Sequence, residues 1–578
     1  MLVVQRCAEL VSHGTSIGRR PRTLTPRAAL MEACVLAGAY FRADGITNAA
    51  ASPENAGHGV KMLPDVAAEA AHVLAGDPVL KSTGSSLPEH VLPHLRQWAS
   101  EQPQVDPSAI SRLEAFAASL ERTYLSDVFT TLDRFVTKEP EHLFALEAVC
   151  GCLVSELRHR GWADKTLSSI FSALNAEAPA DLTGKLRQGF PAKPSRFRCY
   201  VPVSLGGLRL EQSFREHTGL PVLPKLPVSA TDRSLPQRGP FVEIEVEEHD
   251  AQTAAEQAYS KVSATIGALA IFKPENVEMR SRVVGVSVTG SINGHDISAP
   301  EPIERRETTQ DEVNRILAGT RPGKLDRDAV FDAIRHRTRA HESQDPESRF
   351  ILLWFALERL VLGAPGQGKT LSAARALIPK AIAIGKVRSE ILGLGAAILQ
   401  LGLTDEEWSG LFGLVGWKRE SRRIDHAKLL AMLQSPKKES EKLTAFFYER
   451  DVRLVQWYER LRKALYGSKP AKIVPLFEES RRRIDWQVMR LYRARNSVAH
   501  AGQGPSWLRD LTFHANHYLT QLIAIVVHHR QRTPGASSAE ILSSRAGQYD
   551  AFLALLKSGD PRALEPKHLL KPTLLVGT

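Results

Sequence analysis

The chain has little of what secreted and membrane-spanning proteins need. It contains five cysteines among 578 residues, and an odd number in so long a chain does not make a disulfide framework. The longest apolar runs, such as 350–357, have the size of core segments and are too short to span a membrane. The first 20 residues include Glu9 and no long apolar stretch before Arg19 and Arg20, so we expect no secretory signal. A reducing cytoplasm and no membrane partner are therefore expected.

Signatures of metal and cofactor binding are also scarce. Cys150 and Cys152 are separated by one residue, and no second Cys or His pair stands at zinc spacing, so we interpret them as helix-packing residues. His514 and His517 lie one helical turn apart, but no carboxylate stands near them in the sequence. The sequence therefore predicts neither a metal site nor a cofactor.

The composition is that of an ordinary globular protein. Hydrophobic residues make up 43% and charged residues 24% of the chain, and its length calls for two to four domains. Helical spacing of apolar residues dominates, so we predict a mainly α protein with a small α/β module. The predicted parts are a helical region at 1–190, the α/β module at 191–320, a helical domain at 321–535 and a C-terminal tail at 536–578. The tail carries one expected helix, Ala539–Leu556.

Strand signals occur only in the second of these parts. Phe197–Val203, Phe241–Val246 and Val283–Val288 are rich in β-branched and aromatic residues, and Asn293-Gly294 predicts a turn after the third strand. Ala251–Ala270, between the second and third strands, predicts a helix. The boundary with the preceding helical region is expected at the prolines of 191–194.

Positive charge is concentrated near the C-terminal third. The chain has 75 Lys and Arg against 64 Asp and Glu, a net charge of +11. Residues 451–500 alone contain twelve basic and five acidic side chains. A cluster of this kind predicts an anionic partner, although it also occurs on ordinary solvated helix faces.

Gly363–Thr370 matches the nucleotide-binding pattern G-x-x-x-x-G-K-[ST]. In that pattern backbone amides cradle phosphates, while Lys369 after Gly368 would reach them and Thr370 would bind Mg²⁺. The loop must follow a strand, yet Asp345-Pro346-Glu347 is typical of a helix start and the apolar pattern continues to Leu362. Gly363 is then well placed to end a helix. A glycine-rich link between helices is the favoured interpretation, and an ATP- or GTP-binding protein stays as an alternative.

Arg495-Asn-Ser-Val-Ala-His500 resembles the R-x(4–6)-H signature of the HEPN superfamily, specifically its Apea-like branch. Arg493 and His500, six residues apart, fit the same signature. The helix at 349–358 resembles the first helix of such domains, and 512–529 resembles the closing helix. The resemblance covers roughly 325–535 and implies a helical bundle.

The resemblance implies a metal-independent endoribonuclease that acts as a homodimer or higher homo-oligomer, as in toxins and antiviral defence effectors. His500 would exchange a proton as the ribose 2′-OH attacks the adjacent phosphate, and Arg495 would hold that phosphate. Asn496 and Arg493 are the further candidate catalytic residues. The expected RNA-binding residues are Arg481, Arg482, Arg483 and Arg490. The rest of the chain would restrain or trigger the nuclease.

Helix geometry leaves the role of each motif residue open. At 100° per residue, Arg495 falls in the apolar stripe of its helix, while Arg493, Asn496 and His500 fall on the other side. A buried Arg needs an acidic partner, and Glu358 is the expected supporting residue. Alternatively, the helix ends near residue 497 and the preferred pair, Arg495 and His500, converges. Two further hypotheses are a non-catalytic scaffold that binds RNA or a partner, and a surface helix with a capping histidine.

Overall fold

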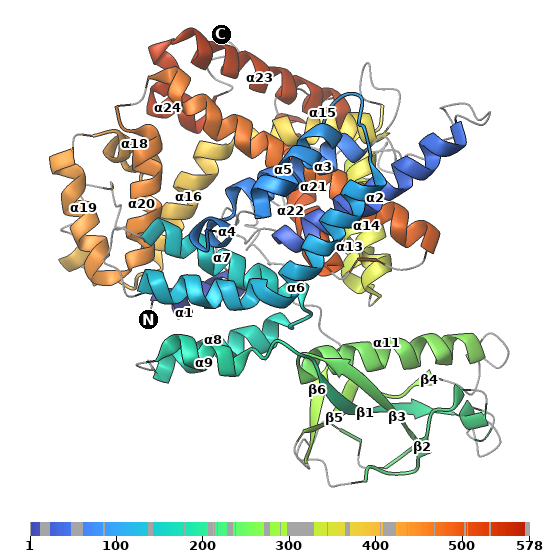
Figure 1. Ribbon diagram of the computed structural model, residues 1–578. Helices are drawn as coiled ribbons and strands as arrows, with labels where there is room; N and C mark the ends of the chain where they lie inside the picture. Colours follow the sequence, from blue (N-terminus) through green and yellow to red (C-terminus); the bar gives the residue numbers. More distant parts are fainter. Residues whose placement is uncertain are drawn as a thin grey trace.

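The structure is a computed structural model of the 578-residue chain. It describes residues 2–11, 24–47, 62–84, 87–136, 143–177, 181–205, 212, 214–216, 218–227, 235–236, 238–270, 278–288, 291–297, 329–343, 345–363, 370–404, 406–408, 415, 424–435, 437–467, 469–501, 504–505, 507–530, 533 and 535–572. Two helical bodies lie together, and a small sheet with one long helix lies to one side of them (Figure 1).

The N-terminal body is all helical. Its helices are α1 (Leu2–Val11), α2 (Pro26–Thr47), α3 (Leu63–Gly76), α4 (Pro78–Ser82), α5 (Leu87–Trp98), α6 (Pro107–Val136), α7 (Leu143–His159), α8 (Asp164–Glu177) and α9 (Leu182–Gly189). They share one apolar core, in which Trp98, Phe171 and Phe190 are almost fully buried. Cys150 and Cys152 on α7 are buried in this core as free thiols, which confirms their packing role.

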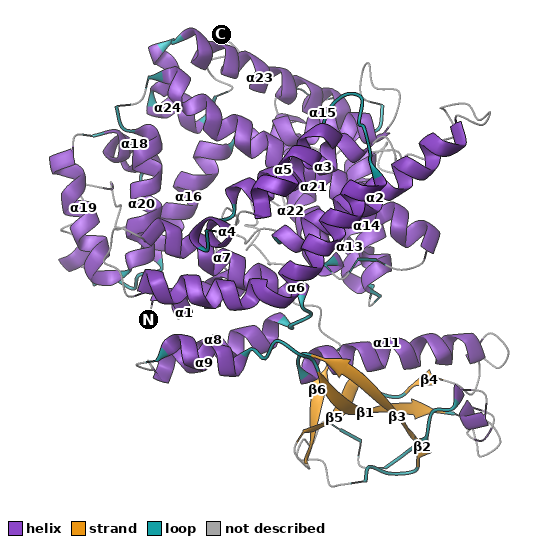
Figure 2. Ribbon diagram, viewed as in Figure 1, coloured by secondary structure: helices purple, strands orange, loops and turns teal. Residues whose placement is uncertain are grey.

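The α/β module follows directly, because α9 ends at Gly189 and the first strand begins at Ser195. It contains β1 (Ser195–Ser204), β2 (Val222–Leu223), β3 (Phe241–Glu248), α11 (Ala251–Ala270), β4 (Glu278–Met279), β5 (Val283–Val288) and β6 (Ser291–Asp296). The strands form an antiparallel sheet in the order β2-β3-β1-β5-β6, with β4 beside β1, and α11 covers one face (Figure 2).

The structure confirms a mainly α protein with a small α/β module, including the predicted helix at α11 and the three predicted strands. The turn expected at Asn293-Gly294 is wrong. Both residues lie inside β6, where Asn293 pairs with Val286 and Gly294 with Gly285 of β5. The glycine at position 285 of β5 is explained by the Ile292 side chain of β6, because a side chain at position 285 would collide with it.

The C-terminal body is a larger helical bundle. Its elements are α13 (Ala329–Glu342), α14 (Pro346–Val361), α15 (Thr370–Ala383), α16 (Lys386–Leu399), α18 (His426–Gln434), α19 (Lys437–Arg450), α20 (Val452–Leu465), α21 (Pro470–Ala501), α22 (Leu508–Arg530), α23 (Ser538–Ser558), the 3₁₀ turn η6 (Pro561–Leu564) and α24 (Pro566–Leu570). The expected tail helix is α23, but it does not stand apart from the bundle. Tyr549, Phe552 and Leu569 of this segment are buried in the same core as α14 and α21.

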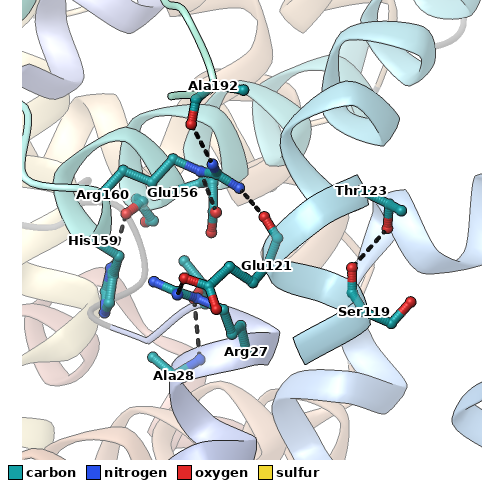
Figure 3. A network of polar contacts seen from close by, with 11 residues as sticks. Arg27, Ala28, Ser119, Glu121, Thr123, Glu156, His159, Arg160 and Ala192 are labelled. Atoms are coloured by element: carbon teal, nitrogen blue, oxygen red, sulfur yellow. Dashed lines mark hydrogen bonds and ion pairs between the residues drawn. The ribbon is translucent and has the colours of Figure 1, made fainter. Parts of the chain in front are cut away.

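Arg160, just after α7, connects several segments near the start of the module (Figure 3). Its Nε donates to the Glu156 carboxylate at 2.8 Å and its Nη2 donates to the Glu121 carbonyl of α6 at 2.6 Å. Its Nη1 reaches the carbonyl of Ala192, in the link to β1, at 3.4 Å. Arg27 of α2 binds the Glu121 carboxylate at 2.8 Å, so α2, α6, α7 and the link form one network (Figure 3).

Asp250 also fixes the module to the N-terminal body. Its buried carboxylate accepts hydrogen bonds from the amides of Ala163 at 2.8 Å and Thr253 at 2.9 Å, and from the Thr166 hydroxyl at 3.1 Å. One side chain therefore caps α11 and also binds the start of α8. Within the helices that the structure describes, none is long and apolar enough to cross a membrane.

We predict that Asp250→Ala lowers the free energy of unfolding of the module by about 2–4 kcal/mol, because a helix cap and buried donors lose their acceptor. Urea denaturation and proteolysis within residues 190–200 measure the loss. Asp425→Ala, which removes the exposed cap of α18, is the matched control and should leave this proteolysis unchanged. Equal behaviour of the two variants would contradict the role of Asp250.

Candidate functional site

The motif lies on α21, the longest helix described in the C-terminal body. This helix runs from Pro470 to Ala501. Ile484, Val488 and Leu491 form the buried stripe expected from the sequence. The stripe packs against the surrounding helices of the bundle, so the position and rotation of α21 are set by its apolar side.

The end of α21 decides which motif residues share a face. The helix continues to Ala501, so it does not end near Ser497 as one alternative required. At 100° per residue, Arg495 and His500 then project about 140° apart, whereas Arg493, Asn496 and His500 share one face. His500 lies on the last turn, and its side chain lies outside the described part of the structure.

Arg495 is half-buried, as its place in the apolar stripe predicts. Its Nη1 donates to the Oδ1 of Asn496 at 3.0 Å. Its Nε is buried and has no hydrogen-bond partner within the described part of the chain. The guanidinium is thus linked to the Asn496 side chain, which lies on the same face as His500.

The expected support of Arg495 by Glu358 is wrong. Trp354 of α14 contacts Tyr492 with ring centroids 5.9 Å apart, and the Gly504 amide reaches the Glu347 carboxylate at 3.5 Å. The two helices therefore run antiparallel, and at 1.5 Å per residue Glu358 lies about 10 Å from Arg495 along their axes. No ion pair joins the two among the described residues.

Glu358 instead lines a hollow of about 240 Å³ beside α14. The lining residues are His336, Phe355, Glu358, Arg359, Leu362 and Thr370. Thr370 begins α15, while Gly368 and Lys369 lie outside the described residues. The segment before the glycine-rich loop is the helix α14, started by the Asp345 cap and followed by Gly363 at φ 80°. This is the helix–glycine–helix link that the sequence favours, and not the strand that a nucleotide-binding loop follows.

The N-terminal body contacts the motif helix through acid–arginine pairs. Arg490 binds Glu69 of α3 at 2.5 Å, and their side chains are 6% and 4% exposed. One turn later, Arg493 binds Glu32 of α2 at 2.6 Å, with side chains 13% and 16% exposed. A candidate catalytic arginine is therefore already occupied by a carboxylate from a distant part of the chain.

Further pairs extend the same contact along α21. Arg375 of α15 binds Asp485 of α21 at 3.0 Å and Asp65 of α3 at 2.8 Å. Hydrogen bonds to Asp485 and then to Asp65 raise the pKa of Arg375 despite its partial burial. His72 of α3 lies 3.4 Å from the Glu479 carboxylate, and its hydrogen bond is the first of the contacts that lower the pKa of Glu479.

The basic cluster does not form one open RNA-binding face. Arg482 and Arg483 are exposed but both bind Glu479 of their own helix, and Arg481 is half-buried. Arg490, predicted to bind RNA, is buried against Glu69, so its guanidinium is paired with a carboxylate in the conformation described. The count of charges in the sequence overstates the free positive charge, because acids of the same helix and of other helices pair with several of these arginines.

The sequence interpretation missed Glu32 and Glu69. Glu69 interrupts the run Ala67-Ala68-Glu69-Ala70-Ala71, and Glu32 stands among small and apolar residues of α2. A carboxylate at such a position is costly to bury without a basic partner, which is the signal that could have indicated a distant arginine. Nothing in the sequence indicated which arginine this would be.

In the comparison with known proteins, no family model, no curated protein and no solved structure matches the chain. In the described part of the chain, no group of three or more His, Cys, Asp and Glu side chains could hold a metal ion. The candidate site therefore consists of the face of α21 that carries Arg493, Asn496 and His500, with Arg495 beside Asn496.

We predict that Glu69→Gln lowers the free energy of unfolding by about 3–5 kcal/mol, because Arg490 would remain buried without a counter-charge. The double variant Glu69→Leu with Arg490→Met should recover most of that loss, because it replaces the buried pair with apolar groups. Urea denaturation followed by circular dichroism measures both.

Asp133→Asn is the matched control for this prediction, since its partner Arg187 is about as exposed as Asp133 itself. It should have little effect on the denaturation midpoint. A double variant that is less stable than Glu69→Gln would show that the pair itself does not cause the loss.

Proposed function

We propose that the protein is a metal-independent endoribonuclease that cleaves RNA through attack of a ribose 2′-OH on the adjacent phosphate. The observation that carries the proposal is the Arg493, Asn496 and His500 face on the last turns of α21, in a motif that resembles the HEPN signature. The 2′-oxygen would bond to phosphorus as the bond from phosphorus to the 5′-oxygen breaks. The products would be a 2′,3′-cyclic phosphate and a 5′-hydroxyl.

The residues of this face match the needs of that reaction. An imidazole at position 500 would accept the 2′-OH proton or deliver a proton to the leaving 5′-oxygen. An arginine would hold the phosphate through two parallel hydrogen bonds and stabilise the charge that builds on its oxygens. Arg493 shares a face with His500, while Arg495 is held by Asn496. We therefore propose Arg493 as the phosphate-binding arginine, with Arg495 and Asn496 positioning the end of the helix.

The expected result is cleavage of RNA, but not of DNA, in the presence of EDTA. His500→Ala and Arg493→Ala should each slow cleavage by about 100-fold or more, because a proton-transfer group or a charge-stabilising group is lost. Arg495→Ala should have a smaller effect on the cleavage rate. Gel analysis of a 5′-labelled RNA measures the rates.

His90→Ala on α5 and Arg112→Ala on α6 are matched controls, because both residues are exposed on the N-terminal body. Equal cleavage by wild type and His500→Ala would contradict the proposal. RNA binding by wild type without any cleavage would favour a non-catalytic scaffold instead.

We further propose that the N-terminal body restrains this activity. Glu32 pairs with Arg493, and Glu69 pairs with Arg490 one turn earlier, so carboxylates stand where phosphates would have to bind. A trigger that separates α2 and α3 from α21 would release the arginines. The five free, buried cysteines fit a reducing cytoplasm, and we propose that the protein acts there on RNA as a homo-oligomeric toxin or antiviral defence effector.

Glu32→Gln should increase RNA cleavage at subsaturating substrate by about fivefold or more, because Arg493 loses its competing carboxylate. The change should appear mainly in KM. Asp133→Asn changes the charge equally on the same body and should leave cleavage unchanged. A Glu32→Gln variant with wild-type KM and kcat would argue against restraint by this pair.

A further inference from the structure

A second group of positive side chains lies at the junction of α13 and α14. Arg337 of α13 donates its Nε to the Oδ1 of Asn516, a buried amide of α22, at 2.9 Å. Arg349 of α14 donates its Nε to the Ala340 carbonyl at 3.1 Å and its Nη2 to the Ser343 carbonyl at 2.8 Å. Both guanidinium groups are thus held in place by neutral acceptors.

These two arginines differ from the others near the motif. Arg490 and Arg493 have carboxylate partners, and so do Arg335 and Arg359, which both approach Asp332. Arg337 and Arg349 have no such partner within the described segments of the chain. Their charge is therefore fixed in position but not neutralised, which is the arrangement that suits an external anion.

His341 of α13 belongs to the same group. Part of its side chain is exposed at the surface, and part is covered by the protein. This partial burial, followed by the charges of Arg337 and Arg349, lowers the pKa of His341 to about 4. Burial and the nearby Arg509 lower the pKa of Arg349 as well. The imidazole is therefore neutral at pH 7, where it can donate one hydrogen bond without adding charge.

The carboxylates nearby have other partners or face water. Asp345 caps α14 by accepting from the Ser348 amide at 2.7 Å, and Glu347 accepts from the Gly504 amide at 3.5 Å. Glu342, the neighbour of His341, is exposed. None of these three binds Arg337 or Arg349.

The group lies level with the candidate site. Because α14 and α21 run antiparallel with Trp354 against Tyr492, Arg349 lies about 7.5 Å before that contact on α14, and Arg495 about 4.5 Å beyond it on α21. Both displacements point the same way, so the two arginines differ by about 3 Å along the axes. The start of α14 and the end of α21 therefore lie at a similar height along the two helix axes.

We propose that Arg337, Arg349 and the His341 side chain form a phosphate-binding site for the backbone of RNA, separate from the arginines of α21. The ligand follows from the proposed ribonuclease function, on which this inference rests. The two guanidinium groups would each bind phosphate oxygens, and the imidazole would donate to a third oxygen or to a ribose hydroxyl. Among the described residues, no N-terminal acid pairs with this site, so it would hold RNA while Arg493 is still occupied by Glu32.

The test measures binding of a fluorescent 2′-O-methyl oligouridylate, which cannot be cleaved by 2′-OH attack, to the full-length chain. Fluorescence anisotropy gives the Kd as a function of salt concentration. Arg337→Gln and Arg349→Gln should each raise the Kd by about tenfold, and each should reduce the slope of log K against log salt by about 1. Thermal melting checks that both variants fold, since Arg349 also holds two backbone carbonyls.

His341→Glu is the second variant, because the residue is exposed and its replacement brings a negative charge into the group without removing an arginine. It should raise the Kd by about tenfold as well. There are two controls. Arg335→Gln lies on the same helix, but Asp332 already neutralises that guanidinium. Gln102→Glu adds a negative charge at an exposed position in the N-terminal body. Both should bind RNA as wild type does.

The outcomes separate this site from the proposed function. Loss of RNA binding in the three variants supports the site even if the wild-type chain cleaves no RNA. Wild-type affinity and salt slope in folded Arg337→Gln, Arg349→Gln and His341→Glu overturn it, even if His500→Ala abolishes cleavage. Failure of the wild-type chain to bind the oligonucleotide overturns it too.

Discussion

The pairing of N-terminal carboxylates with the arginines of α21 is the constraint on which the arrangement of the two helical bodies depends. Arg490 and Glu69 are both nearly inaccessible to water, and charges so placed are tolerable only when they remain in contact. Separation of the bodies without solvation of both groups would leave two unpaired buried ions. The restraint that we propose would therefore work as a two-state contact, closed with the pair intact as described here, or open with both charges in water.

This constraint connects assembly with the chemistry of the motif. Glu32 reaches Arg493 from α2, and Asp65 reaches Arg375 from α3, so one of the acids that position the N-terminal body also occupies a cation of the candidate site. A carboxylate accepts hydrogen bonds from a guanidinium in the same geometry as a phosphate does. A phosphodiester and the N-terminal body cannot bind Arg493 in the same way at the same time. Restraint of the proposed nuclease thus needs no separate inhibitory segment.

Local sequence signals predicted the helices and strands well, because the start and end of such an element depend on residues close by in the sequence. The cap at Asp345, the terminating Gly363 and the strand Val283–Val288 all appear where the pattern placed them. The partners of charged side chains could not be predicted in this way. The sequence predicts an Arg495–Glu358 pair because both residues fall on apolar helix faces. Whether they meet depends on the direction of α14 relative to α21, and that direction is set by packing. The partner of Arg490 lies 421 residues away.

The distribution of free charge shows why composition alone misplaces a binding surface. Residues 451–500 carry twelve basic side chains, yet several of them bind Glu479, Glu69, Glu32 or Glu390 in the folded chain. Residues 329–349, which include α13, contain as many acids as arginines. A count of charges therefore does not predict an anion-binding site there. There Asp345 caps a helix, while the acceptors of Arg337 and Arg349 among the described residues are neutral oxygens. What an anion meets is the charge left after folding, which is why we propose the site beside the start of α14 and not one along the middle of α21.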